Sequence, residues 1–125
     1  MGNTLLSIIT IVLFLLLCGI YPLGMIRFPG ESSEKRRKAM DCSLRKIHKS
    51  LGIWIIAAAL LHGIVEIKAG NLEGMASGKA AFLFLILLLV SYGCKRILRE
   101  KWLFVHRILA VLAVITVIIH VGGTL

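Results

Sequence analysis

Four long runs of uncharged, mostly apolar residues dominate this chain. They cover residues 4–26, 50–65, 80–93 and 108–125, and nearly all the charge lies in the segments between them. A chain of 125 residues with 58% hydrophobic content exceeds what one small soluble core can bury, whereas about 20 apolar residues form a helix that crosses a bilayer. The sequence therefore predicts an all-α membrane protein with four transmembrane helices.

The two middle runs are shorter than a membrane span, so each predicted helix includes flanking residues whose basic side chains reach the interface. The predicted helices are 4–26, 44–68, 79–98 and 102–123, within a single domain over residues 1–125. The first run has neither a basic segment before it nor a small-residue cleavage site, so we expect a retained helix rather than a signal peptide.

The basic residues are distributed unevenly over the three connections. The first has Arg27, Lys35, Arg36, Arg37, Lys38, Arg45, Lys46 and Lys49, the third has Lys95, Arg96, Arg99, Lys101 and Arg107, and the second has only Lys68 and Lys79. By the positive-inside rule the first and third connections face the cytoplasm. We therefore expect a four-transmembrane-helix bundle of two helical hairpins, with both termini outside, in a bacterial or archaeal cytoplasmic membrane.

The chain has four histidines, and they form two pairs with one spacing. His48 and His62 are fourteen positions apart, as are His106 and His120. Fourteen positions are two heptads, which return to nearly the same face of a packed helix. In the predicted topology helices 44–68 and 102–123 are parallel, so His48 and His106 lie near the cytoplasmic face, and His62 and His120 lie about 21 Å further out.

An internal repeat leads to the same arrangement. Residues 47–52 align with 105–110, and the alignment continues without a gap to the second histidine of each pair. Two hairpins related by an axis along the membrane normal would produce such a repeat.

Imidazole nitrogen is a good axial ligand for haem iron, and one imidazole on each side of the ring leaves no open coordination position. Such a haem transfers single electrons. The spacing predicts two haem b groups between the parallel helices, the inner iron held by His48 and His106 and the outer iron by His62 and His120. The residues predicted to face each other between these levels are small or aliphatic: Gly52, Ile55, Ala59, Ala110, Ala113 and Val117.

Haem propionates need cationic or hydrogen-bonding partners. Arg45, Lys49 and Arg107 lie within a turn of the inner histidines, although the positive-inside rule alone also explains them. Candidates on the outer side, without ranking, are Lys68, Asn71, Ser77, Lys79 and Thr124. Gly19, Gly24, Gly78 and Gly93 are positions that could admit either a haem edge or a close neighbouring group.

Two other interpretations of the histidines stay open. An intramembrane histidine can be a hydrogen-bonding partner between helices. The histidines could also bind zinc or a similar ion along a transport pathway, although transport sites usually mix imidazole with carboxylate or thiolate. Glu66 is the only carboxylate within four residues of a histidine on its helix.

The two histidine pairs on the second and fourth helices resemble the haem-binding part of the respiratory and photosynthetic cytochromes b, and are similar to the membrane domains of ferric reductases and NADPH oxidases. The resemblance implies that His48, His62, His106 and His120 are axial ligands of two haem b groups. The Pro-Glu-Trp motif of the respiratory quinol-oxidising enzymes is not found in the sequence, and neither is a flavin or NAD segment.

We therefore expect transmembrane electron transfer between a cytoplasmic or quinol donor and an acceptor at the outer face. The electrons would come from another subunit, a soluble reductase or membrane quinol. The alternative is a small membrane oxidoreductase that exchanges electrons between quinone and superoxide or ferric iron, and a haem-free metal-ion transporter is the third hypothesis. The expected partners are membrane lipid and a redox protein or quinone, with no nucleic acid. The basic segment 31–38 could contact an acidic electron donor or anionic lipid.

Overall fold

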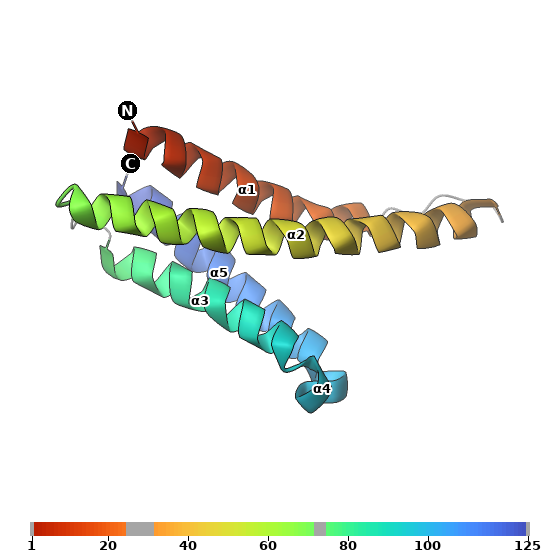
Figure 1. The fold of residues 1–125 in the computed structure, drawn as a ribbon. Coiled ribbons are helices and arrows are strands. Elements are labelled where there is room, and N and C mark those ends of the chain that lie inside the picture. Colours follow the sequence, from red (N-terminus) through yellow and green to blue (C-terminus); the bar gives the residue numbers. More distant parts are fainter. Residues whose placement is uncertain (1, 25–31, 72–74, 125) are drawn as a thin grey trace. The chain divides into compact units, whose positions relative to one another are not determined.

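The computed structural model describes residues 2–24, 32–71 and 75–124, which are helical apart from short turns (Figure 1). The chain divides into two units, Met1–Ala58 and Ala59–Leu125. The elements in order are α1 (Gly2–Gly24), α2 (Ser32–Lys68), α3 (Met75–Gly93), α4 (Lys95–Leu98), the 3₁₀ helix η1 (Arg99–Lys101) and α5 (Trp102–Thr124).

Helix α2 is the element that differs most from the prediction. It begins at Ser32 rather than at residue 44, so the predicted boundary is wrong and most of the basic first connection is helical. Its 37 residues span about 55 Å, nearly twice the hydrocarbon thickness of a bilayer. Glu34 and Lys38 form an exposed i,i+4 ion pair at 3.1 Å on this extension.

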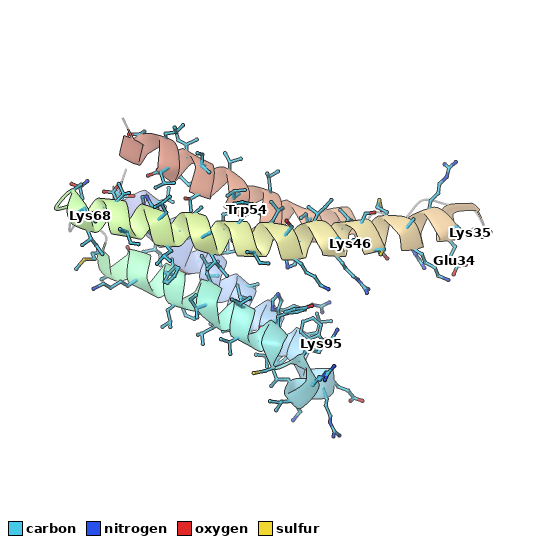
Figure 2. All side chains as sticks on the ribbon, viewed as in Figure 1. Glu34, Lys35, Lys46, Trp54, Lys68 and Lys95 are labelled. Atoms are coloured by element: carbon cyan, nitrogen blue, oxygen red, sulfur yellow. The ribbon has the colours of Figure 1, made fainter. Side chains whose placement is uncertain are left out.

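Charge divides α2 into two parts along its length. Figure 2 shows Glu34, Lys35 and Lys46 on the N-terminal part of the helix, Trp54 within the apolar part and Lys68 at its end. The apolar part is long enough to cross a bilayer, and the charged part extends beyond it.

The end of α2 is set by a Schellman motif centred on Gly70. Gly70 has a φ of +76°, a conformation that costs residues with a Cβ atom about 1–2 kcal/mol. The Gly70 amide donates to the Ile67 carbonyl at 3.1 Å, and the Asn71 amide donates to the Glu66 carbonyl at 3.1 Å. The helix therefore ends close to residue 68, as the sequence predicts.

The second unit contains an antiparallel helical hairpin formed by α3 and α5 (Figure 1). Its buried side chains are Ala81, Leu85 and Ser91 on α3 and Ala113 on α5. Small residues such as Ala81 and Ala113 allow two membrane helices to approach closely. Helix α3 ends at Gly93 rather than at residue 98, and the short elements α4 and η1 complete the reversal of the chain.

The apolar surface of the described residues is mostly exposed. Three helical segments are long and apolar enough to cross a membrane, namely Glu34–Lys68, Met75–Gly93 and Lys95–Thr124, and α1 contributes a shorter apolar stretch, Thr4–Ile20. Large side chains such as Ile53 (65% exposed) and Phe104 (68% exposed) have little protein around them. Because a soluble monomer rarely exposes so much apolar surface, the helices are consistent with a multi-pass membrane protein.

Candidate functional site

The structure brings His62 and His120 together within the second unit. Their ring centroids are 6.3 Å apart, and their planes are inclined at 72°. His62 lies near the end of α2, and His120 lies near the end of α5. Both side chains are half-buried. An imidazole of α2 and an imidazole of α5 thus lie next to each other. These are the two histidines that the sequence predicts as the outer pair.

Helix α3 fixes the position of the His120 ring from the side. The Ser77 hydroxyl and His120 Nδ1 are 3.1 Å apart, within hydrogen-bonding distance. At Gly78, a Cβ atom would lie 3.0 Å from His120 Cε1 and 3.4 Å from Nδ1, so the ring packs directly against the helix backbone. The sequence left open whether Gly78 admits a haem edge or a close neighbour. The close neighbour is His120.

His106 has a corresponding partner on α3. The Ser91 hydroxyl lies 2.9 Å from His106 Nδ1 and donates a hydrogen bond to the Leu88 carbonyl at 2.7 Å. Ser91 is buried, with 5% of its surface exposed. A buried hydroxyl in this position has its hydrogen bonds satisfied within the protein.

The Trp102 ring lies next to His106 and in turn contacts Tyr92. The Trp102 ring centroid is 5.8 Å from that of His106, with the planes inclined at 53°, and the Tyr92 centroid is 6.5 Å from that of Trp102. Lys95 Nζ lies 4.8 Å from the Trp102 ring centroid, within the range of a cation–π interaction. Trp102, the first residue of α5, therefore contacts one of the four histidines.

The inner histidine pair falls in different units. His48 is half-buried on the part of α2 that belongs to the first unit, and His106 belongs to the second. The shared iron of His48 and His106 stays a prediction.

The six residues predicted to face each other between the histidine levels are buried or half-buried. Ile55 and Ala113, which lie midway between the histidines of α2 and α5 respectively, are each only 1% exposed. Gly52, Ala59, Ala110 and Val117 are all half-buried. Gly52 and Ile55 belong to the first unit and the other four residues to the second, so their facing one another stays a prediction.

The candidate propionate partners near the inner histidines are all exposed. Arg45 and Lys49 line a shallow depression along α2 together with Lys38, Asp41, Cys42 and Lys46. Arg45 is one turn before His48, on the same side of the helix, whereas Arg107 directly follows His106. Lys49 likewise directly follows His48, and the role of all three residues stays a prediction.

The candidate propionate partners on the outer side differ in their hydrogen-bond partners. The Asn71 amide donates to the Glu66 carboxylate at 2.7 Å, and the Thr124 hydroxyl donates to the His120 carbonyl at 2.9 Å. Ser77 contacts a histidine instead. Lys68 and Lys79 are exposed. Ser77 is therefore the outer candidate that belongs to the site.

Sequence reasoning missed Ser91 and left Ser77 without rank. Fourteen positions separate the two serines, the same interval as His106 and His120. In an antiparallel hairpin, equal intervals on the two helices place both members of each pair opposite one another. This matched interval is the signal that could have identified the serines.

His62 and His120 are residues of the type that can hold a haem, since two imidazoles suffice as protein ligands. Edge-to-face contacts between rings have centroids about 4.5–7 Å apart, and two imidazoles that hold one metal ion would fall within the same range. The observed separation of His62 and His120 is 6.3 Å. Within the described ranges, no three His, Cys, Asp or Glu side chains converge on a common point, but a haem iron needs only two protein ligands.

We found no protein-family model that matches the chain, and no curated protein or solved structure that is similar to it.

Proposed function

We propose that this chain is a membrane cytochrome that transfers electrons across the bilayer through two haem b groups, each held by two histidines. The observation that carries the proposal is the separation of 6.3 Å between the His62 and His120 rings. The separation brings the two rings close enough to hold one metal ion between them, and it also lies within the range of about 4.5–7 Å for edge-to-face ring contacts. The four-histidine spacing extends the same arrangement to His48 and His106.

The chemistry that a bound haem supplies is reversible one-electron transfer at an iron whose two axial positions are filled. The residues near a bound haem would have three roles. The four histidines, His48, His62, His106 and His120, would hold the two haems. Ser77 and Ser91 orient the rings on α5. Ala113, which is 1% exposed and lies midway between the two histidines of α5, keeps that stretch of the helix apolar.

The levels are separated along the membrane normal. Fourteen residues of α5 separate His106 from His120, which corresponds to about 21 Å of helix. One haem would therefore lie toward each face of a hydrocarbon layer about 30 Å thick. This separation favours electron transfer across the membrane over chemistry at a single surface.

The proposed topology is a four-helix bundle of two hairpins with both termini outside. Its support is the distribution of basic residues, which gather on the N-terminal part of α2 and in the reversal between α3 and α5. The exposed basic part of α2 would lie on the cytoplasmic side, where it can meet an acidic redox protein or anionic lipid. Electrons would enter there from such a protein, or from quinol in the membrane.

Electron transfer across a bilayer can be measured with vesicles that contain the purified, haem-loaded chain. Ferricyanide is trapped inside, and a membrane-impermeant reductant is added outside. We expect the trapped ferricyanide to be reduced through the wild-type chain and through Thr116→Ala, but not through His62→Ala. Thr116 is a suitable control because its hydroxyl bonds only to carbonyls of its own helix, at 2.9 and 3.0 Å.

Trapped ferricyanide that stays oxidised, although both haems are reduced from outside, would contradict electron transfer across the membrane.

A further inference from the structure

Both histidines of α5 contact a serine of α3 through the same ring nitrogen. His120 Nδ1 is 3.1 Å from Ser77 Oγ, and His106 Nδ1 is 2.9 Å from Ser91 Oγ. The two contacts are fourteen residues apart on each helix. The same contact between a serine of α3 and a histidine of α5 therefore occurs twice, once at His120 and once at His106.

The direction of the hydrogen bond at His106 follows from the bonds of Ser91. A serine hydroxyl carries one hydrogen, and Ser91 donates it to the Leu88 carbonyl at 2.7 Å. While that hydrogen is on the Leu88 side, the same oxygen accepts toward His106. In this arrangement His106 Nδ1 carries the hydrogen of the contact.

The tautomer of the imidazole follows in turn. A neutral imidazole has one N–H group, so a hydrogen on Nδ1 leaves the lone pair on Nε2. Ser91 is only 5% exposed, which limits competition from water for this bond. The neutral His106 ring is thus held in the tautomer whose Nε2 can bind a metal.

At His120 a second contact acts together with the serine. Gly78 follows Ser77 directly, and its missing Cβ would lie 3.0 Å from His120 Cε1. The ring is therefore fixed by a hydrogen bond at Nδ1 and by packing against the α3 backbone. The polarity of this bond is inferred from the equivalent pair Ser91 and His106, where the Leu88 carbonyl takes the serine hydrogen.

We propose that Ser77 and Ser91 are positioning residues that accept a hydrogen bond from Nδ1–H of His120 and His106 and so present Nε2 as the metal-binding nitrogen. This inference rests on the proposed function, since it assigns a role to the serines in haem binding. Neither serine is an iron ligand. Partners of this kind orient ligating histidines and adjust the electronic properties of the metal.

The tautomers can be measured without haem. Protein labelled with ¹⁵N in its histidine rings is prepared under haem-limiting conditions, and the ¹⁵N chemical shifts distinguish Nδ1–H from Nε2–H. In the wild type we expect His106 and His120 as the Nδ1–H tautomer. Ser91→Ala should shift His106 alone toward a mixture of tautomers, and Ser77→Ala should shift His120 alone.

The controls separate this role from a general structural one. Thr116→Ala removes a hydroxyl from α5 that bonds only to its own helix, so it should change neither histidine. Ser91→Thr retains a hydroxyl and should retain the Nδ1–H tautomer of His106. An Nε2–H tautomer in the wild type, or an unchanged His106 in folded Ser91→Ala, would overturn the inference.

With haem present, each serine variant should weaken binding at its own level by about 10-fold to 100-fold, the usual effect of losing such a partner. Its haem should also show a changed midpoint potential, while the other haem keeps its own. Equal losses at both levels would overturn the assignment of one serine to each haem. If the tautomers are as expected but the chain binds no haem, the proposed function fails while the hydrogen-bonding role stands.

Discussion

The substitution Gly78→Ala should weaken the outer haem without destabilising the helices. The new Cβ atom would lie 3.0 Å from His120 Cε1, whereas ordinary contacts begin at 3.4 Å, so the ring has to recede by about 0.4 Å. Metal–ligand distances tolerate changes of only about 0.2 Å. A ring at the end of a side chain can move aside when no metal holds it, and then loses the position needed for binding.

The magnitude follows from the usual cost of overpacking. An extra methyl group in a well-packed site costs about 1–3 kcal/mol. If this strain arises only when the ring is held on iron, the affinity for the outer haem falls by about 5-fold to 150-fold. In the haem-free protein the same change replaces a helical glycine by alanine, which stabilises by about 0.5–1 kcal/mol. Haem affinity and helix stability should therefore change in opposite directions.

The assay is a haem titration of the chain carrying His106→Ala, in which only the outer level is complete. Gly93→Ala on the same helix is the matched control, since nothing lies within 4 Å of the Cβ atom it would add. We expect weaker haem binding in Gly78→Ala and unchanged binding in Gly93→Ala. Unchanged affinity of folded Gly78→Ala for the outer haem would refute the close packing of His120 against α3.

Three further results are expected. The 72° angle between the His62 and His120 planes predicts that the outer ferric haem gives the highly anisotropic low-spin electron paramagnetic resonance signal of near-perpendicular imidazoles, and a signal typical of parallel planes would contradict it. Ala113→Leu should lower the free energy of unfolding by about 1–3 kcal/mol in thermal unfolding, because position 113 is 1% exposed. Val111→Leu, at a 59% exposed site, should not lower it. Equal unfolding midpoints of the two variants would contradict the close packing around Ala113. Gly70→Ala should cost about 1–2 kcal/mol because of its φ of +76°, and an unchanged melting temperature would argue against the Schellman motif.

The positions of the helices could be predicted from the sequence better than their ends. The predicted helix at 102–123 agrees closely with α5, because its uncharged run and its length both fit one membrane span. The start of α2 was missed because charge indicates where lipid ends, not where a helix ends. Glu, Lys, Arg, Ala and Met are good helix formers, so the segment from Ser32 to Leu44 continues the helix outside the apolar region.

The candidate site was predicted in part for a similar reason. The histidines stand out because an imidazole in an apolar run is rare and their spacing repeats. Ser91 does not stand out, since a single serine in a membrane helix commonly bonds to a carbonyl of its own helix, as it also does here with Leu88. Its contact with His106 depends on the register between α3 and α5, which neither helix specifies alone.

The ratio of haem to protein tests whether the four histidines bind two haems. A pyridine haemochrome assay and a reduced-minus-oxidised spectrum are recorded for the wild type, His62→Ala and His106→Ala. We expect two low-spin b haems per wild-type chain. His62→Ala should disturb mainly the outer haem, and His106→Ala mainly the inner one. A colourless wild-type protein, expressed with ample haem, would contradict this expectation.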